Sequence, residues 1–303
     1  NASRFVQMNL DGYTPGAPKA ETAEDAWMLS RLAHAVAEAT EQLETYNFGD
    51  YARDIQSFFW GDVCDWYIEL CKGRLLDGSA DEKLQVQRNL VYVLDVSMRL
   101  LHPVMPFVTE SVWDALPASG LDAHDAQFLM VAKWPEPEGL SCFVNQKAES
   151  DFELAKRVIS SVRSTRARYR LSPKAELAVS VRASVADSAV LESQAGFIRS
   201  VGRVSDFVAG AGAAKPEGAV SVADGSLEIF VDLGGLVDLA AEASRLKKEL
   251  EKAQKELSGV ERTLSNEGFV TKAAPAVIEK KRTQAAELAA TIDQLKSQIA
   301  DFQ

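Results

Sequence analysis

The sequence predicts a mainly α-helical protein with a small α+β part: an antiparallel helical bundle, a small α+β domain and a C-terminal antiparallel coiled-coil hairpin. Three patterns indicate this fold class. Apolar residues recur at helical spacing in the first half, alternate with period two from Leu177, and follow a heptad from Leu239. A chain of 303 residues, 47% of them hydrophobic, can form two or three domains, which we expect at 1–138, 139–235 and 236–303.

The bundle is expected to form around an aromatic-rich stretch, residues 58–72. One helix from about Asn47 to Gly73 would place an apolar stripe on its core side, made of Phe48, Ala52, Ile55, Phe59, Trp66 and Leu70. Because aromatic side chains bury the largest areas, the other helices are expected to pack on this one.

A helix is predicted before this stretch, because Thr22 and Asp25 are spaced as in a capping box. Its core positions are Leu29, Leu32, Val36, Ala39, Leu43 and Tyr46. Trp27 and Arg31 fall on the opposite side of this helix. An exposed indole is costly, so we expect Trp27 to be covered either by a neighbouring helix or by a nucleobase.

Two more helices complete the predicted bundle. Ser79 and Glu82 form a second capping box, which opens a helix over 81–101. His102-Pro103 ends it, because the residue before proline disfavours the helical conformation. A short helix from Pro106 to Leu116 follows, which makes four antiparallel helices joined by short loops.

The pattern changes in the middle of the chain. We expect a short strand at 128–132, a domain boundary near 137–139, and a helix over 146–170 with the basic residues Lys156, Arg157, Arg163, Arg166, Arg168 and Arg170. After the strand that begins at Leu177 we expect a helix near 187–199 and strands at 204–208, 220–222 and 227–231. Asp224-Gly225 indicates a hairpin between the last two strands.

The last part of the chain has two heptad runs, from Leu239 to Leu264 and from Ile278 to Phe302. The break near Asn266 and the helix start at Pro275 predict that they fold back on each other as a coiled-coil hairpin. At about 1.5 Å per residue each helix would be about 40 Å long. The seam takes up the heptad residues, so only the flanking charges could contact a partner.

The composition excludes several classes of protein. A net charge of -11 argues against bulk nucleic-acid affinity, although residues 151–174 are locally basic. The cysteines lack paired spacing and are expected to be reduced, buried thiols in a cytoplasmic protein. The histidines His34, His102 and His124 are too far apart for a metal site, and no apolar run is long enough to cross a membrane. Because the chain starts at Asn1 within a helical pattern, we expect it to be part of a larger protein.

Six short motifs stand out along the chain: Asn1-Ala2-Ser3-Arg4-Phe5-Val6, Trp27-Met28-Leu29-Ser30-Arg31-Leu32, Asp62-Val63-Cys64-Asp65-Trp66-Tyr67-Ile68-Glu69, Leu100-Leu101-His102-Pro103-Val104-Met105-Pro106-Phe107, Leu264-Ser265-Asn266-Glu267-Gly268-Phe269-Val270 and Lys272-Ala273-Ala274-Pro275. In this order they resemble the C-terminal part of the bacterial valyl-tRNA synthetases. The bundle motifs are shared with the isoleucyl and leucyl families, and the terminal hairpin narrows the resemblance to the valyl family.

The resemblance implies a tRNA-binding part of a class I aminoacyl-tRNA synthetase. The bundle would be the anticodon-binding domain, the α+β domain a linker, and the hairpin an arm against the outer corner of valine tRNA. Valine activation with ATP and Mg²⁺, tRNA charging and editing of threonine would belong to an absent N-terminal part. This fragment, which has no His-Ile-Gly-His or Lys-Met-Ser-Lys signature, would have no catalytic residue, cofactor or metal and would be monomeric.

The candidate tRNA contacts fall in three places. The anticodon surface would include Arg4, Trp27 and Arg31. The tRNA backbone would meet Arg163, Arg166 and Arg170 on the basic helix, and on the arm Arg245, Lys248, Lys252, Arg262, Lys280, Lys281 and Arg282. The alternative is that these charges form a solvated helix face or pair with one another between the arm helices.

Two other functions are weighed against tRNA binding. A structural adaptor that binds another protein would explain the periodicity and the acidity, but not Trp27, Arg31 or the basic helix. A hydrolytic enzyme would need a nucleophile and base at a credible spacing, which the sequence does not show. Asp62, Asp65 and Glu69 share a helix face and could mimic an acid pair, but we interpret them as surface or capping carboxylates.

Overall fold

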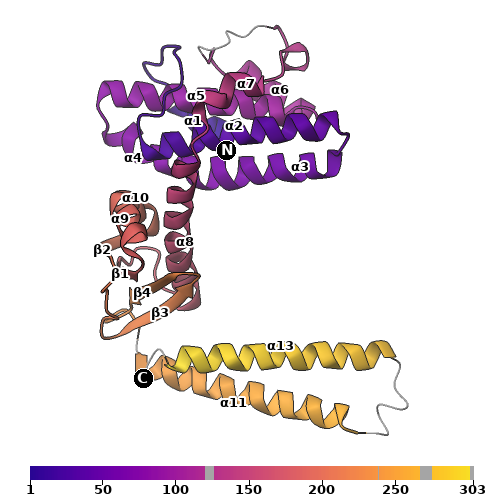
Figure 1. Cartoon of the computed structure of the whole chain (residues 1–303), viewed down its shortest axis with the longest axis vertical. Helices are drawn as coiled ribbons and strands as arrows, with labels where there is room; N and C mark the ends of the chain where they lie inside the picture. Colours follow the sequence, from indigo (N-terminus) through magenta and orange to yellow (C-terminus); the bar gives the residue numbers. More distant parts are fainter. Residues whose placement is uncertain (120–125, 238, 267–274, 301–303) are drawn as a thin grey trace. The chain divides into compact units, whose positions relative to one another are not determined.

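The computed structural model describes residues 1–119, 126–237, 239–266 and 275–300. It divides into two compact units, Asn1–Lys156 and Arg157–Gln303. The first unit is helical, and the second contains a four-stranded sheet and a helical hairpin (Figure 1). The predicted fold class, mainly helical with a small α+β part and a C-terminal hairpin, is confirmed. The predicted domain bounds at residues 138 and 235 stay predictions.

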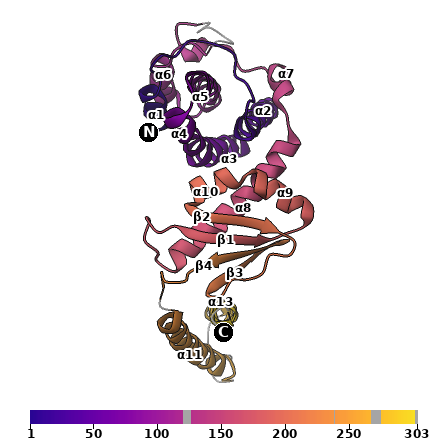
Figure 2. The ribbon, with the colours of Figure 1, turned by 90° about the vertical axis from the view of Figure 1, so that its left-hand side faces the viewer.

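The helices of the first unit surround one central helix. Its elements in chain order are α1 (Ala2–Met8), α2 (Ala23–Glu44), α3 (Phe48–Ser57), η1 (Phe58–Tyr67), α4 (Ile68–Asp77), α5 (Ala80–Leu101) and α6 (Pro106–Asp114). Figure 2 looks along these helices and shows α5 in the middle. Most residues of α5 are buried. The expectation that the other helices pack around the aromatic stretch is therefore wrong, because the central helix is α5.

The helix predicted from Asn47 to Gly73 is continuous, but its middle part, η1, is a π-helix. A π-helix closes i→i+5 hydrogen bonds, so each of its turns contains more residues than an α-helical turn. The buried face therefore shifts along the chain, from Tyr51, Ile55 and Phe58 to Val63, Trp66, Tyr67 and Cys71. The predicted stripe assumed one constant period and so missed Phe58, Val63 and Tyr67; it also wrongly included Phe48, which is exposed at the start of α3.

Both predicted capping residues begin their helices. The Thr22 hydroxyl accepts a hydrogen bond from the Asp25 backbone N–H at the start of α2. Ser79 and Glu82 form a reciprocal capping box at the start of α5. These caps satisfy backbone N–H groups that a helix start would otherwise leave unpaired.

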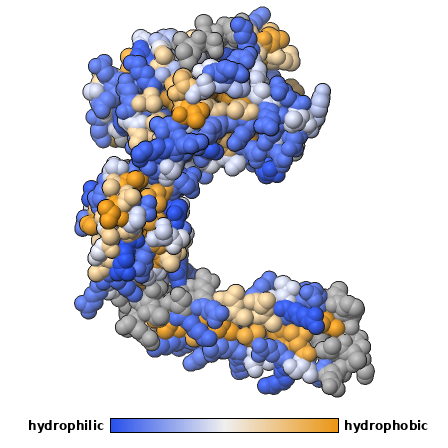
Figure 3. Space-filling model, in the orientation of Figure 1, coloured by the Kyte–Doolittle hydropathy of each residue, from blue (hydrophilic) through white to orange (hydrophobic). Residues whose placement is uncertain are grey.

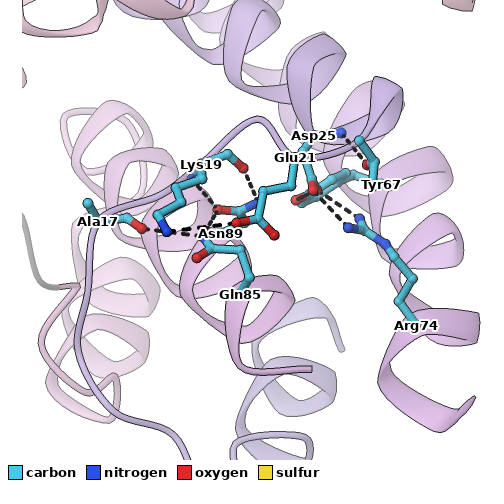
Figure 4. Close-up of polar contacts among 9 residues, drawn as sticks. Ala17, Lys19, Glu21, Asp25, Tyr67, Arg74, Gln85 and Asn89 are labelled. Carbon is cyan, nitrogen blue, oxygen red and sulfur yellow. Dashed lines mark hydrogen bonds and ion pairs between the residues drawn. The ribbon is translucent and has the colours of Figure 1, made fainter. Parts of the chain in front are cut away.

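The Asp25 side chain has a second role, as part of a buried ion pair. Its carboxylate is fully buried, accepts two hydrogen bonds from the Arg74 guanidinium at 2.7 and 2.8 Å, and accepts a third from the Tyr67 hydroxyl at 2.8 Å (Figure 4). Burial raises the pKa of Tyr67, which therefore stays neutral and donates. The group joins α2, η1 and α4. In the same view, the side-chain amide of Asn89 in α5 accepts a hydrogen bond from the backbone N–H of Lys19 and donates one to the backbone carbonyl of Lys19. These two hydrogen bonds fix the loop before α2.

The chain after α6 stays with the helical unit. The predicted strand at 128–132 is wrong: Leu129–Val131 forms a 3₁₀ turn, η2. Glu110 of α6 accepts hydrogen bonds from the backbone N–H groups of Leu129 and Met130, which a strand would have given to a neighbouring strand. Helix α7 (Pro137–Leu140) and the turn η3 (Ser141–Phe143) then pack on α2.

The second unit holds a four-stranded sheet in the order β2-β1-β4-β3. The strands are β1 (Leu177–Arg182), β2 (Val204–Gly210), β3 (Ala219–Asp224) and β4 (Leu227–Asp232). β1 is parallel to β2 and antiparallel to β4, and β3–β4 is the predicted hairpin, with Gly225 at a positive φ of 56°. The part of helix α8 (Gln146–Arg168) that belongs to this unit, residues 157–168, runs along one face of this sheet in Figure 2.

The helix predicted near 187–199 is two helices, α9 (Val185–Ser193) and α10 (Ala195–Gly202), which both pack on β2. Gln194 separates them, and its backbone N–H bonds back to Val190 and Leu191. A periodic pattern alone does not reveal such a break, because the apolar residues on its two sides stay in phase.

The arm consists of α11 (Leu239–Leu264) and α13 (Pro275–Ala300). Its seam is built from the predicted heptad residues, with Leu246, Ala253, Ile292, Leu295 and Ile299 buried and Leu250 and Leu257 partly buried. Figure 3 shows the corresponding apolar band between the two helices. The predicted seam residue Phe302 and the predicted break at 267–269 lie outside the residues that the structure describes.

Two further expectations can be compared with the structure. Cys71 is buried, Cys64 is partly buried and Cys142 is exposed, so the prediction of a buried thiol is wrong for Cys142, which lies in the exposed turn η3. None of the helices within the described ranges combines the length and apolar character needed to cross a membrane. His124 lies outside those ranges.

Candidate nucleic-acid interface

Trp27 lies inside the helical unit and not on its surface. Only 2% of it is exposed, and its ring stacks on Phe152 with the ring centroids 3.8 Å apart. Phe152 belongs to α8, beyond the predicted domain boundary, and α8 is the neighbouring helix that covers the indole. The expected anticodon contact through an exposed Trp27 is therefore corrected: this indole is a packing residue.

Arg31 lies one turn from Trp27, at the edge of a charged cluster formed by α2, η1 and α8. Its guanidinium contacts Asp62 at 2.9 Å and Glu149 at 3.7 Å. Lys156 contacts the same Asp62 at 3.6 Å and lies over the rings of Trp27 and Trp66. Burial is the largest single influence on the pKa of Arg31 and lowers it, but Asp62, Glu149 and Glu38 together outweigh burial and raise that pKa, so Arg31 stays charged.

The same cluster explains the three carboxylates on one helix face. Asp65 and Glu69 are exposed, as expected, but Asp62 is buried between Arg31 and Lys156. Asp62 therefore pairs with two cations and is not a surface carboxylate. A cavity of about 330 Å³ lies over this cluster, lined by Trp27, Arg31, Asp62, Glu149, Ser150, Glu153 and Lys156. Arg4 is exposed on α1 and does not line this cavity.

The three arginines predicted on one face of α8 have different environments. Arg166 donates hydrogen bonds to the backbone carbonyls of Ala175 at 2.7 Å and Arg203 at 2.6 Å, so it joins the helix end to the sheet. Burial and the nearby charge of Arg203 lower its pKa. Arg163 is exposed. Arg170 lies beyond the end of α8, in a left-handed conformation with φ of 49°, and is also exposed.

Two basic residues near this helix end were missed by the sequence reasoning. Arg203 follows α10 in a left-handed conformation and donates to the Pro173 carbonyl, and Lys174 is exposed next to that proline. The sequence signal that could have found Arg203 is Gly202-Arg203 at the end of an apolar helix. Helices commonly end with a residue in the left-handed conformation, and a cation at that end stabilises the helix. Arg166 donates to the backbone carbonyl of Arg203, and the charge of Arg203 lies close enough to help lower the pKa of Arg166, so this corner of the second unit is locally basic.

The cations of the arm lie on its exposed flanks, as predicted. Arg245 pairs with Glu249, Lys252 with Glu256 and Arg282 with Glu279, each within one helix. Lys281 contacts Gln284. Lys248, Arg262 and Lys280 are exposed and make no ion pair within the described part of the chain. The ion pairs between helices that we considered as the alternative do not occur among the described arm residues.

These parts define the class of the protein. The chain belongs to the family of anticodon-binding domains of tRNA ligases, whose family model matches residues 25–181. A second family model, described as the tRNA binding arm of valyl tRNA synthetase, matches residues 238–303. The first match covers the helical unit from residue 25 onward and most of β1, and the second covers the arm.

The similar proteins are valine–tRNA ligases. That of Thermotoga maritima is 36% identical over 303 residues, which are 100% of this chain and 33% of the relative. Those of Symbiobacterium thermophilum and Geobacter sulfurreducens are each 37% identical, over 99% of this chain and 35% and 34% of their own length. The chain thus spans about a third of the relatives it matches.

Proposed function

We propose that this chain is the C-terminal, tRNA-binding part of a valine–tRNA ligase. The observation that supports it is the order of parts: a helical bundle of the anticodon-binding family, then an α+β region, then a heptad hairpin similar to the valyl tRNA-binding arm. In this proposal the remaining two thirds of the ligase activates valine with ATP and Mg²⁺ and transfers it to the tRNA. The part described here would be inactive alone, monomeric and cytoplasmic.

The bundle would meet the anticodon through exposed cations. Arg4 is accessible on α1, and Arg31 keeps a third of its side chain exposed while Asp62 and Glu149 hold its direction. A guanidinium held in this way loses little conformational freedom on binding, which favours a specific contact. Trp27 would act indirectly, since it supports the surface around Arg31.

The tRNA backbone would be held by the other basic residues. Arg163 and Arg170 are exposed, whereas Arg166 uses its hydrogen bonds within the protein and would contribute charge alone. On the arm the candidates are Arg245, Lys248, Lys252, Arg262, Lys280, Lys281 and Arg282. Those that make no ion pair within the described residues, Lys248, Arg262 and Lys280, would lose the least on meeting phosphates.

The test is a gel shift of the chain with valine tRNA and with a tRNA for another amino acid. We expect tighter binding of valine tRNA, and a loss of affinity of about ten-fold or more when residues 237–303 are deleted. In the full ligase the same deletion should leave valine activation intact and reduce tRNA charging. Equal, negligible binding of both tRNAs would contradict the proposal and favour the protein-binding adaptor.

A further inference from the structure

The helical unit contains an apolar groove that the proposed function does not use. It has a volume of about 630 Å³ and lies between α1, η1, α4, α5 and α6. Its walls are mainly apolar side chains: Phe5, Phe59, Trp60, Ile68, Leu94, Met98, Leu101, Met105, Val108 and Val112, with Cys64 among them. A groove of this size could receive several large side chains.

The rim of the groove exposes two residues that are usually covered. Trp60 is 46% exposed and Val108 is 54% exposed, although Trp27, Trp66 and Trp113 of the same unit are buried. Leaving such side chains in water forgoes about 25 cal/mol for each Å² of apolar surface that could be buried. Exposed apolar surface that continues into a groove is typical of a docking site.

The polar groups in the groove do not suit a small polar ligand. The Thr109 hydroxyl is already bonded to the Met105 carbonyl and to His102. The Lys72 ammonium is paired with Glu69 and lies 5.9 Å from the centre of the Phe5 ring. Small-molecule sites are also mainly apolar, but they add a few placed polar groups that fix the orientation of the ligand. Because Thr109 and Lys72 are already engaged, the walls fit an apolar polypeptide segment better.

We propose that this groove docks an apolar segment of the remaining part of the same ligase chain, which would hold the anticodon-binding unit against the rest of the enzyme. The inference rests on the proposed function. The relatives match over only about a third of their length, so some two thirds of such a polypeptide lie outside the region described here. A segment tethered in the same chain has a high effective concentration, so a groove of modest affinity would be occupied.

The three native cysteines allow a direct test. Cys64 lines the groove and is partly buried, Cys142 is exposed in a turn elsewhere, and Cys71 is fully buried. Burial, with the nearby charge of Asp65, raises the pKa of Cys64, so labelling should be run at mildly alkaline pH. The 303-residue chain and the full ligase are labelled with a maleimide, and the rate at each cysteine is read by peptide mass spectrometry.

If the segment fills the groove, Cys64 should react about ten-fold or more slowly in the full ligase than in the 303-residue chain. Cys142 should react equally in both, and Cys71 should stay unlabelled in both, which reports that the shorter chain is folded. Equal Cys64 rates in the two proteins would overturn the proposal. Protection of Cys64 that rises with the concentration of the 303-residue chain alone would overturn it too, by showing that a second copy occupies the groove.

A pair of matched variants strengthens the test. Val108→Arg in the full ligase places a charge at the groove rim and should restore fast labelling of Cys64. Leu76→Arg introduces the same charge at a position on α4 that is 75% exposed and does not line the groove, and it should change nothing. A gel shift with valine tRNA on the same samples keeps the two proposals separate, because tRNA binding by the 303-residue chain does not depend on the groove.

Discussion

In the bundle the buried carboxylates of Asp25 and Asp62 pair with cations of other helices, whereas in the arm every ion pair among the described residues joins exposed residues of one helix. The bundle pairs connect α2 to η1, α4 and α8, and a buried charge without its partner is very unfavourable. The arm pairs are exposed, and such pairs contribute little to stability.

This difference separates two uses of charge. The buried carboxylates of the bundle, Asp25 and Asp62, fix the positions of the helices around them, because each pairs with cations of other helices. The charges of the arm fix nothing in the hairpin, whose stability comes from its apolar seam. The arm cations can therefore exchange a carboxylate for a phosphate at small cost, whereas Arg74 cannot leave the buried carboxylate of Asp25, nor Arg31 that of Asp62, without a large one.

The strongest test of the comparison is Asp25→Ala. It leaves the Arg74 guanidinium and the Tyr67 hydroxyl without their partner in the interior, and we expect the free energy of unfolding to fall by about 3–5 kcal/mol. Urea denaturation measures it. Asp50→Ala, which removes an exposed carboxylate paired with Arg53, is the control and should give an unchanged unfolding curve. Equal curves for the two variants would contradict a structural role for the buried pair.

A smaller effect is expected in the seam of the arm. Leu246→Ala removes a buried side chain of the hairpin core, and we expect the local opening free energy of α11 to fall by about 2–3 kcal/mol. Amide hydrogen exchange measures it, since it reports opening of one element separately from global unfolding. Lys252→Ala removes an exposed ion pair of the same helix, with Glu256, and should leave exchange nearly unchanged. Equal exchange in both variants would mean that the seam does not hold the arm together.

Trp27→Phe sharpens the comparison within the bundle. We expect a loss of stability of about 1–2 kcal/mol, because a smaller ring leaves a gap beside Phe152. The affinity for valine tRNA should stay within about two-fold of the parent, because the indole is buried and stacks on the protein. A ten-fold loss of affinity for valine tRNA in a variant that remains folded would contradict this and indicate that Trp27 contacts the anticodon.

The parts that could be predicted from the sequence depend on local pattern. The heptads of the arm, the caps at Thr22 and Ser79 and the hairpin at Gly225 are each set by neighbouring residues, and the structure has all of them. The buried stripe of the aromatic helix could not be predicted, because a π-helix changes the period within the element.

The candidate site was harder to predict, because its partners are distant in sequence. Whether Trp27 is exposed depends on Phe152, and the direction of Arg31 depends on Asp62 and Glu149. Spacing within α2 shows which side of the helix a residue takes, but not what lies against that side. The cations of the arm needed no such information, since a heptad already places them outside the seam.

The smallest expected effect concerns those arm cations, measured as the salt dependence of tRNA binding. Replacing Arg262 and Lys280 by Gln should weaken binding of valine tRNA and reduce the slope of log K against log salt by about 0.7–0.9 for each phosphate that the protein no longer neutralises. Arg53→Gln is the matched control, because it removes an exposed bundle cation that is paired with Asp50 and Asp54. The salt slope of this control should equal that of the parent chain. If the parent chain, the arm variant and the control all give the same slope, the flanks of the arm do not contact phosphates. The difference between the buried charges of the bundle and the exposed charges of the arm would then concern stability alone.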